Sequence, residues 1–131
     1  MADKNPRLLV VDDEVQYLGS LGRAFSGSFE VDTAETLEQS VAKLDSNNYD
    51  AVLTDLQLTS GGSEGMEVIT YARKKLPRAV IVMNSAAMLP GSDLEKQALS
   101  LGADKAVKKP IALFAVRGYL LETCQSRQGG N

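Results

Sequence analysis

Residues 7–14 have the sequence Arg-Leu-Leu-Val-Val-Asp-Asp-Glu, an apolar run that ends in three carboxylates. A short run that is apolar on both faces is typical of a strand buried inside a parallel sheet. A strand with one solvent-exposed face would instead alternate polar and apolar residues. Two similar runs follow, Ala51–Leu56 (AVLTDL) and Ala79–Met83 (AVIVM). The three runs together predict the centre of a parallel sheet.

Strand-like and helix-like segments alternate five times along the chain, which predicts an α/β fold with a doubly wound, five-stranded parallel sheet. The predicted strands are Arg7–Val11, Phe29–Thr33, Ala51–Leu56, Ala79–Met83 and Lys105–Lys108. The predicted helices are Glu14–Phe25, Thr36–Asn47, Met66–Lys75, Asp93–Leu101 and Ile111–Thr123. Right-handed crossovers place these helices on both faces of the sheet. The last strand is the most polar, so we expect it at a sheet edge.

The chain length predicts a single domain over residues 1–131, with its folded core at about 7–123. A chain of 131 residues buries enough surface to fold without a disulfide or a structural metal. Residues 125–131 are polar and contain two glycines, so we expect a flexible tail or the start of a linker there.

Composition excludes several classes of function. The chain has no histidine, which excludes Ser-His-Asp and Cys-His nucleophilic sites and most kinds of zinc site. The net charge of −3, without a basic stripe, argues against nucleic acid as a partner. No segment approaches the roughly 18 apolar residues that cross a bilayer, so we expect no membrane contact. The single cysteine, Cys124, fits a cytoplasmic location and a packing role.

Polar residues lie at the ends of four predicted strands. They are Asp12 and Asp13 after the first, Asp55 at the end of the third, Ser85 after the fourth and Lys109 after the fifth. In a doubly wound sheet, ligands bind beyond the carboxyl ends of the strands, where the strand order reverses. We therefore expect three carboxylates, a hydroxyl and an ammonium to converge at one edge of the sheet.

Each of these residues also has an ordinary structural interpretation. The Asp12-Asp13 pair could cap the following helix. Asp55 alone would be a solvated loop residue, Ser85 a turn residue and Lys109 a surface charge. Their joint occurrence at successive strand ends favours a functional site over these separate interpretations.

With these motifs, LLVVDDE, AVLTDL, VMNSA and KKP, the sequence resembles the receiver domain of two-component response regulators over about residues 7–123. The resemblance implies a flavodoxin-like fold with strand order 2-1-3-4-5 and a cis peptide bond before Pro110. It also implies that Asp55 accepts a phosphoryl group from a partner sensor histidine kinase or phosphotransfer protein, in a reaction that needs Mg²⁺.

The resemblance further implies a role for each site residue. Asp13, Asp55 and the backbone carbonyl of Gln57 would bind Mg²⁺ directly, and Asp12 would bind it through water. Lys109 would neutralise the phosphoryl oxygens, and the Ser85 hydroxyl would donate a hydrogen bond to one of them. The protein would promote only its own phosphorylation and dephosphorylation, and would not be an enzyme for another substrate.

Output would go through the face formed by the fourth helix, fifth strand and fifth helix, to a downstream protein or to a second copy in a homodimer. Two features differ from the family pattern. Ala106 occupies the position where an aromatic switch residue is usual. The loop 58–65 is glycine-rich and lacks the usual proline, so we expect it to be mobile.

Two alternative functions stay open at this point. The chain could be an interaction module that keeps the fold but is no longer phosphorylated, as Ala106 and the altered loop would allow. It could also be a phosphohydrolase of the haloacid dehalogenase type, since Asp55-Leu56-Gln57-Leu58-Thr59 is similar to an Asp-x-Asp-x-Thr motif. Gln57 stands where that motif needs its general acid, which argues against hydrolysis.

Overall fold

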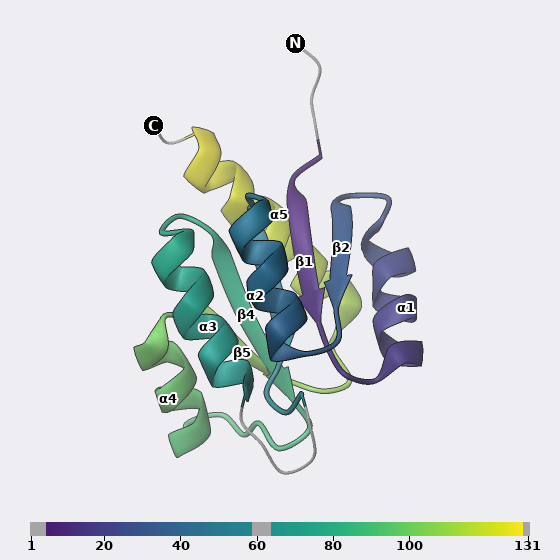
Figure 1. Cartoon of the computed structure of the whole chain (residues 1–131). Helices are drawn as coiled ribbons and strands as arrows, with labels where there is room; N and C mark the ends of the chain where they lie inside the picture. The colour runs from purple at the N-terminus through teal and green to yellow at the C-terminus, as the bar shows by residue number, and fades with distance from the viewer. Residues whose placement is uncertain (1–4, 59–63, 130–131) are drawn as a thin grey trace.

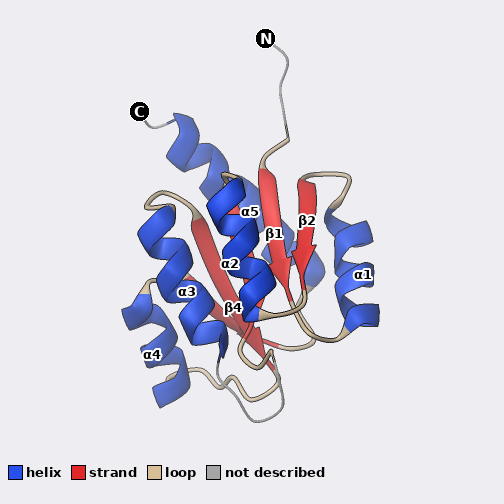
Figure 2. Ribbon diagram, viewed as in Figure 1, coloured by secondary structure: helices blue, strands red, loops and turns tan. Residues whose placement is uncertain are grey.

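The computed structural model describes residues 5–58 and 64–129 and contains the predicted parallel sheet with helices on both faces (Figures 1 and 2). The strands are β1 (Arg7–Val11), β2 (Glu30–Ala34), β3 (Ala51–Asp55), β4 (Val80–Ser85) and β5 (Lys105–Lys108). The helices are α1 (Val15–Phe25), α2 (Leu37–Ser46), α3 (Glu64–Lys75), α4 (Asp93–Leu101) and α5 (Leu113–Gly129). All strands are parallel in the order β2-β1-β3-β4-β5, which confirms the fold class and the edge position of β5.

The alternation of side chains along each strand divides the core into two layers. Leu9 of β1 and Val52 of β3 pack in the layer beneath α2, α3 and α4. Their neighbours Leu8 and Leu53 pack in the layer beneath α1 and α5. Residues two apart on a strand share a face, so Asp55, two residues after Leu53, faces the α1/α5 side of the sheet.

Three helix boundaries follow directly from local chemistry. The Ser92 hydroxyl accepts a hydrogen bond from the Glu95 N–H and caps the start of α4. Gly102 ends this helix with a φ of 125°, a conformation that L side chains rarely adopt. Thr36 caps α2 in the same way by accepting from the Gln39 N–H. Ser92 and Thr36 thus fix where α4 and α2 begin, and Gly102 fixes where α4 ends.

Other boundaries differ from the sequence prediction. β2 begins at Glu30 because the N–H of Phe29 donates to the Phe25 carbonyl and continues the turn after α1. β4 does not end at Met83 but continues to Ser85, so Ser85 is the last residue of the strand rather than a loop residue.

The last helix, predicted to end at Thr123, continues to Gly129 as α5. The reason is a long-range contact. Arg127, in the last turns of the helix, pairs with Asp104 at 2.7 Å and donates a hydrogen bond to the Ala79 carbonyl at 2.8 Å. These partners lie far from Arg127 in the sequence, so composition alone suggested a frayed end.

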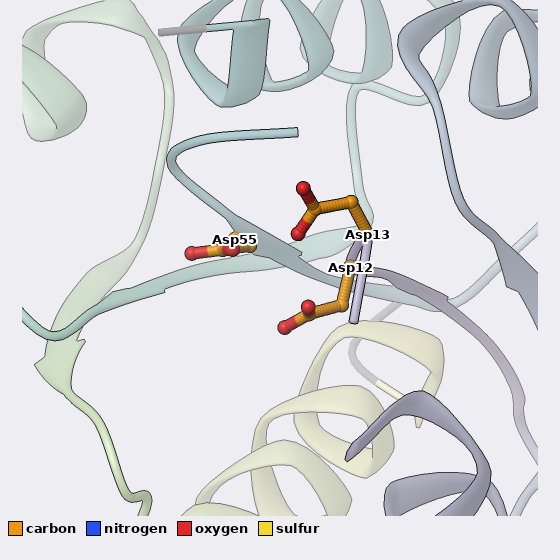
Figure 3. Close-up of side chains that lie close together, drawn as sticks. All are labelled: Asp12, Asp13 and Asp55. Carbon is orange, nitrogen blue, oxygen red and sulfur yellow. The ribbon is translucent and has the colours of Figure 1, made fainter. Parts of the chain in front are cut away.

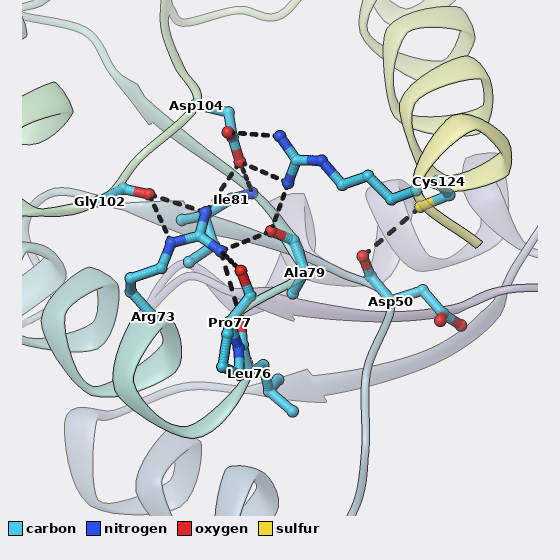
Figure 4. A network of polar contacts seen from close by, with 10 residues as sticks. Asp50, Arg73, Leu76, Pro77, Ala79, Ile81, Gly102, Asp104 and Cys124 are labelled. Atoms are coloured by element: carbon cyan, nitrogen blue, oxygen red, sulfur yellow. Dashed lines mark hydrogen bonds and ion pairs between the residues drawn. The ribbon is translucent and has the colours of Figure 1, made fainter. Parts of the chain in front are cut away.

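Asp104 joins two arginines at the end of the sheet where the strands begin (Figure 4). Arg73 of α3 donates to Asp104 at 2.9 Å and to the Gly102 carbonyl at 2.9 Å. The Ile81 N–H also donates to the Asp104 carboxylate, at 2.9 Å. One carboxylate thus connects the C-terminal ends of α3 and α5 to β4.

The pKa of Asp104 makes this network sensitive to pH. Burial alone would raise the pKa, but the hydrogen bonds from Arg127 and Ile81 and the nearby Arg73 outweigh burial and lower it. The contribution of Asp104 to the free energy of unfolding is therefore complete above its unfolded pKa of about 3.9 and is lost as the pH falls through the lower folded pKa.

We expect Asp104→Asn to lower the free energy of unfolding by about 1–2 kcal/mol at pH 7, the range for a partly exposed, charged hydrogen-bond network. The difference from the unaltered protein should shrink as urea unfolding is repeated at lower pH. Glu30→Gln, at an exposed position on β2, is the control and should change stability little at any pH. A deficit for Asp104→Asn that is independent of pH would contradict the ionic role.

Candidate functional site

Three carboxylates meet at the carboxyl ends of β1 and β3. One oxygen from each of Asp12, Asp13 and Asp55 lies within 4.8 Å of the other two (Figure 3). Asp12 follows β1 directly and Asp55 is the last residue of β3, the strand that pairs with β1. Asp12 and Asp55 are buried, with 1% and 8% of their surface exposed, whereas Asp13 is exposed. The structure therefore brings together all three carboxylates that the sequence singled out.

Lys109 adds a cation to this cluster. Its Nζ lies 2.7 Å from Asp12 Oδ2 and 3.3 Å from Asp55 Oδ2. The Lys109 N–H donates to the carbonyl of Ser85 at 3.1 Å, which fixes the backbone beside the end of β4. The peptide bond to Pro110 is cis, as the resemblance implied.

The charges in the site perturb one another. Burial and the nearby Asp12 carboxylate raise the pKa of Asp55, and Lys109 acts in the opposite direction. Burial alone would lower the pKa of Lys109, but Asp12 and Asp55 outweigh it and raise that pKa. Three carboxylates face one ammonium, so the cluster keeps an excess of negative charge and of oxygen donors.

This donor set fits a small divalent cation. Mg²⁺ prefers oxygen ligands and uses one or two carboxylates while it keeps several waters. The exposed Asp13 leaves one side of the cluster open to such waters. Gln57, the other predicted ligand, is exposed two residues beyond the end of β3.

The two oxygens of Asp55 have different environments. Oδ1 accepts a hydrogen bond from the Leu56 N–H at 2.8 Å, and Oδ2 faces the Lys109 ammonium. The carboxylate is therefore held in one orientation at the strand end. A fixed carboxylate beside a cation is suited to attack an electrophile and to stabilise the charge that develops.

Ser85 lies at the same edge of the sheet, but its hydroxyl is engaged within its own loop. Its Oγ accepts a hydrogen bond from the Ala87 N–H at 3.1 Å. The Ser85 carbonyl accepts from the N–H groups of Met88 and Lys109. Ser85 thus links the loop after β4 to the loop after β5.

Three residues that the sequence did not single out also belong to this edge. The Tyr17 ring of α1 lies below Lys109, with Nζ 4.6 Å from its centroid. Asn84 is buried, lies opposite Asp55 in the pairing of β3 with β4, and donates to the Thr54 carbonyl. A polar residue within the apolar run VIVMN was the one signal for Asn84; nothing in the sequence pointed to Tyr17.

Gly65 is the third, because it brings α3 against the backbone of the site. Its N–H donates to the Leu56 carbonyl at 2.8 Å. A Cβ on this residue would lie 2.0 Å from the Asp55 carbonyl oxygen, so the approach requires glycine. The predicted mobility of loop 58–65 concerns mainly residues 59–63, which lie outside the described residues.

The fold and this strand-end cluster define a phosphoacceptor class of protein, and comparison with known families agrees. The model of the response regulator receiver domain matches residues 8–119. The chain belongs to the receiver domain family of response regulators.

Relatives of known name are longer proteins. The transcriptional regulatory protein ResD of Bacillus subtilis is 29% identical over 81% of this chain and 42% of its own length. A protein-glutamate methylesterase/protein-glutamine glutaminase of Azospirillum brasilense is 28% identical over 86% of this chain and 29% of its own length. The chain thus spans less than half of each of these relatives, and the activities in their names refer to those longer proteins.

Solved structures share the fold. A CheY-like receiver domain protein from Methanospirillum hungatei superposes with a TM-score of 0.87 at 23% identity, covering 98% of this chain and 100% of that one. A response regulator from Burkholderia pseudomallei gives a TM-score of 0.79 at 22% identity, covering 98% of this chain and 72% of that one. Among the described helices, none is both long and apolar enough to span a membrane.

Proposed function

We propose that this chain is a single receiver domain that works as a phosphorylation switch, with Asp55 as the phosphoryl acceptor. The observation that carries the proposal is the position of Asp55: buried at the end of β3, with Oδ2 3.3 Å from Lys109 Nζ and within reach of Asp12 and Asp13. The donor would be a phosphohistidine of a sensor histidine kinase or a phosphotransfer protein.

The reaction is a displacement at phosphorus. An Asp55 carboxylate oxygen forms the new phosphorus–oxygen bond while the phosphorus–nitrogen bond of the donor breaks and the imidazole leaves with the electron pair. Lys109 supplies a positive charge for the phosphoryl oxygens and is already held at the acceptor. The protein contributes mainly position and charge, so no further catalytic base is needed.

A bound Mg²⁺ would supply the remaining positive charge for the phosphoryl oxygens. Asp13, Asp55 and the Gln57 carbonyl would hold the ion directly, and Asp12, which already pairs with Lys109, would act through water. The Burkholderia pseudomallei response regulator of the same fold contains a phosphorylated aspartic acid and a calcium ion, which supports the proposal of an aspartyl phosphate and a divalent cation here.

The signal would leave the site through Ser85. Its hydroxyl would release the Ala87 N–H and donate to a phosphoryl oxygen, which shifts the population of the loop between β4 and α4. Ala106 has no aromatic ring to follow this movement, so the loop itself would carry the change.

The receiving surface would be the face formed by α4, β5 and α5. β5 is an edge strand, and two large apolar side chains of the flanking helices, Leu99 and Phe114, are exposed. A downstream protein or a second copy of the chain would bind there, in the cytoplasm where such kinases present their phosphohistidine. The chain would turn over no substrate except its own aspartyl phosphate.

The test is incubation with Mg²⁺ and a small acyl phosphate donor such as acetyl phosphate, followed by mass spectrometry. We expect one added phosphoryl group, located at Asp55 by peptide mapping. The same incubation with a chelator in place of Mg²⁺ should give little or no addition. No addition in the presence of Mg²⁺ would overturn the proposal and leave the interaction module without phosphorylation as the better interpretation.

A further inference from the structure

The Lys109 ammonium is enclosed by three groups. Asp12 and Asp55 contact it at 2.7 and 3.3 Å, and the face of the Tyr17 ring lies 4.6 Å away. The Lys109 side chain is 17% exposed, so the protein covers most of it. The two carboxylates belong to the acceptor cluster, whereas Tyr17 comes from α1 and packs against the core layer beneath α1 and α5.

An aromatic ring of this kind restricts a lysine in a specific way. The ammonium is a compact charge on a flexible four-carbon chain, which loses its position easily. The negative face of the ring attracts the cation without binding it as an ion pair. The ammonium can therefore move from the Asp55 oxygen to a phosphoryl group on that oxygen while it stays over the ring.

The ring itself is held in place by the start of α1. The Glu14 N–H donates to Asp12 Oδ1 at 2.9 Å, and the Leu18 N–H donates to the Glu14 carbonyl at 2.9 Å. Leu18 and Leu21 are buried and fix the helix against the sheet. Tyr17 therefore sits in the first turn of a helix that packs on the sheet and whose N-cap residue, Glu14, is bonded to Asp12 of the acceptor cluster.

We propose that Tyr17 is a positioning residue for phosphoryl transfer: its ring keeps the Lys109 ammonium directed at the acceptor oxygen of Asp55. This inference rests on the proposed function, since it concerns the reaction at that site. It assigns to α1 a part in the reaction that its sequence did not reveal.

The chain offers a matched control. Lys105 Nζ lies 4.9 Å from the centroid of the Tyr119 ring, on β5 and α5. This pair has the same chemistry and a similar distance, but neither residue contacts the carboxylate cluster. A general effect of losing a tyrosine under a lysine would appear at both positions, whereas a positioning effect would appear at Tyr17 alone.

The experiment measures the rate constant of phosphorylation by acetyl phosphate in Mg²⁺. Tyr17→Leu should lower it about fivefold, which corresponds to about 1 kcal/mol and lies within the range of cation–π interactions. Tyr17→Phe keeps the ring face and should stay close to the unaltered rate. Trifluorophenylalanine at position 17 keeps the shape but depletes the negative face, so it should be as slow as Tyr17→Leu. Tyr119→Leu should have no effect.

The outcomes separate the two proposals. If the unaltered protein takes up no phosphoryl group, the proposed function fails. If the unaltered protein is phosphorylated and Tyr17→Leu is equally fast, the role of Tyr17 fails alone. A Tyr17→Phe variant as slow as Tyr17→Leu would assign the effect to the hydroxyl and also overturn the inference. Should Tyr17→Leu not fold, as circular dichroism would show, the fluorinated residue compared with Tyr17→Phe decides the question.

Discussion

Replacing Asp55 with asparagine should abolish phosphoryl uptake, because the amide lacks the carboxylate oxygen that forms the new bond. Mass spectrometry after incubation with acetyl phosphate and Mg²⁺ should show the added phosphoryl group on the unaltered protein and none on Asp55→Asn. Asp93→Asn, on the exposed first turn of α4, is the control and should be labelled normally. Full labelling of Asp55→Asn would show that another residue is the acceptor.

The same substitution should stabilise the fold in the absence of a metal. The folded state raises the pKa of Asp55, first through burial and then through Asp12, so the charged carboxylate weakens the fold at neutral pH. We expect the free energy of unfolding of Asp55→Asn to exceed that of the unaltered protein by about 1 kcal/mol at pH 7, a typical size for one substitution.

This stability difference should depend on pH. A raised folded pKa means that the native state binds the proton more tightly than the unfolded state does. The charged Asp55 carboxylate therefore lowers the free energy of unfolding fully above the folded pKa, and this loss disappears below the unfolded pKa of about 3.9. Urea unfolding of both proteins, with a chelator present and at several pH values, measures this loss. If the advantage of Asp55→Asn in free energy of unfolding grew as the pH falls, the raised pKa of Asp55 would be contradicted.

Gly65→Ala should strongly destabilise the fold. Its Cβ would lie 2.0 Å from the Asp55 carbonyl oxygen and 2.7 Å from the Leu56 Cα, both backbone atoms that cannot rotate away. To relieve the overlap, α3 must move off β3 and stretch the hydrogen bond from the Gly65 N–H to the Leu56 carbonyl. We expect a loss of about 3 kcal/mol or more in the free energy of unfolding, at the upper end of the cost of overpacking.

Gly118→Ala provides the matched control for this prediction. Gly118 lies within α5, and a Cβ there would meet nothing within 4 Å. Alanine favours a helix over glycine by about 1 kcal/mol, so this variant should be slightly more stable than the unaltered protein. Urea unfolding of both variants tests the contrast; a loss below about 1 kcal/mol for Gly65→Ala, within the usual range of single substitutions, would show that the contact relaxes freely.

The fold could be predicted because its decisive signals are local. The apolar runs at Arg7–Val11 and Ala51–Leu56 are long enough to identify buried parallel strands, and Gly102 marks a helix end by itself. The end of α5 could not be predicted in this way because it depends on distant partners: Arg127 is held by Asp104 and by the Ala79 carbonyl.

The sequence by itself determined that Asp12, Asp13, Asp55 and Lys109 would meet, because parallel strands carry whatever follows them to one edge of the sheet. Only the tertiary structure decided what surrounds them. The packing of α1 on the sheet places Tyr17 under Lys109, and the contact of α3 with β3 makes Gly65 part of the site. Which segments become strands can be predicted from short stretches of sequence, whereas the approach of a helix depends on all the side chains between it and the sheet.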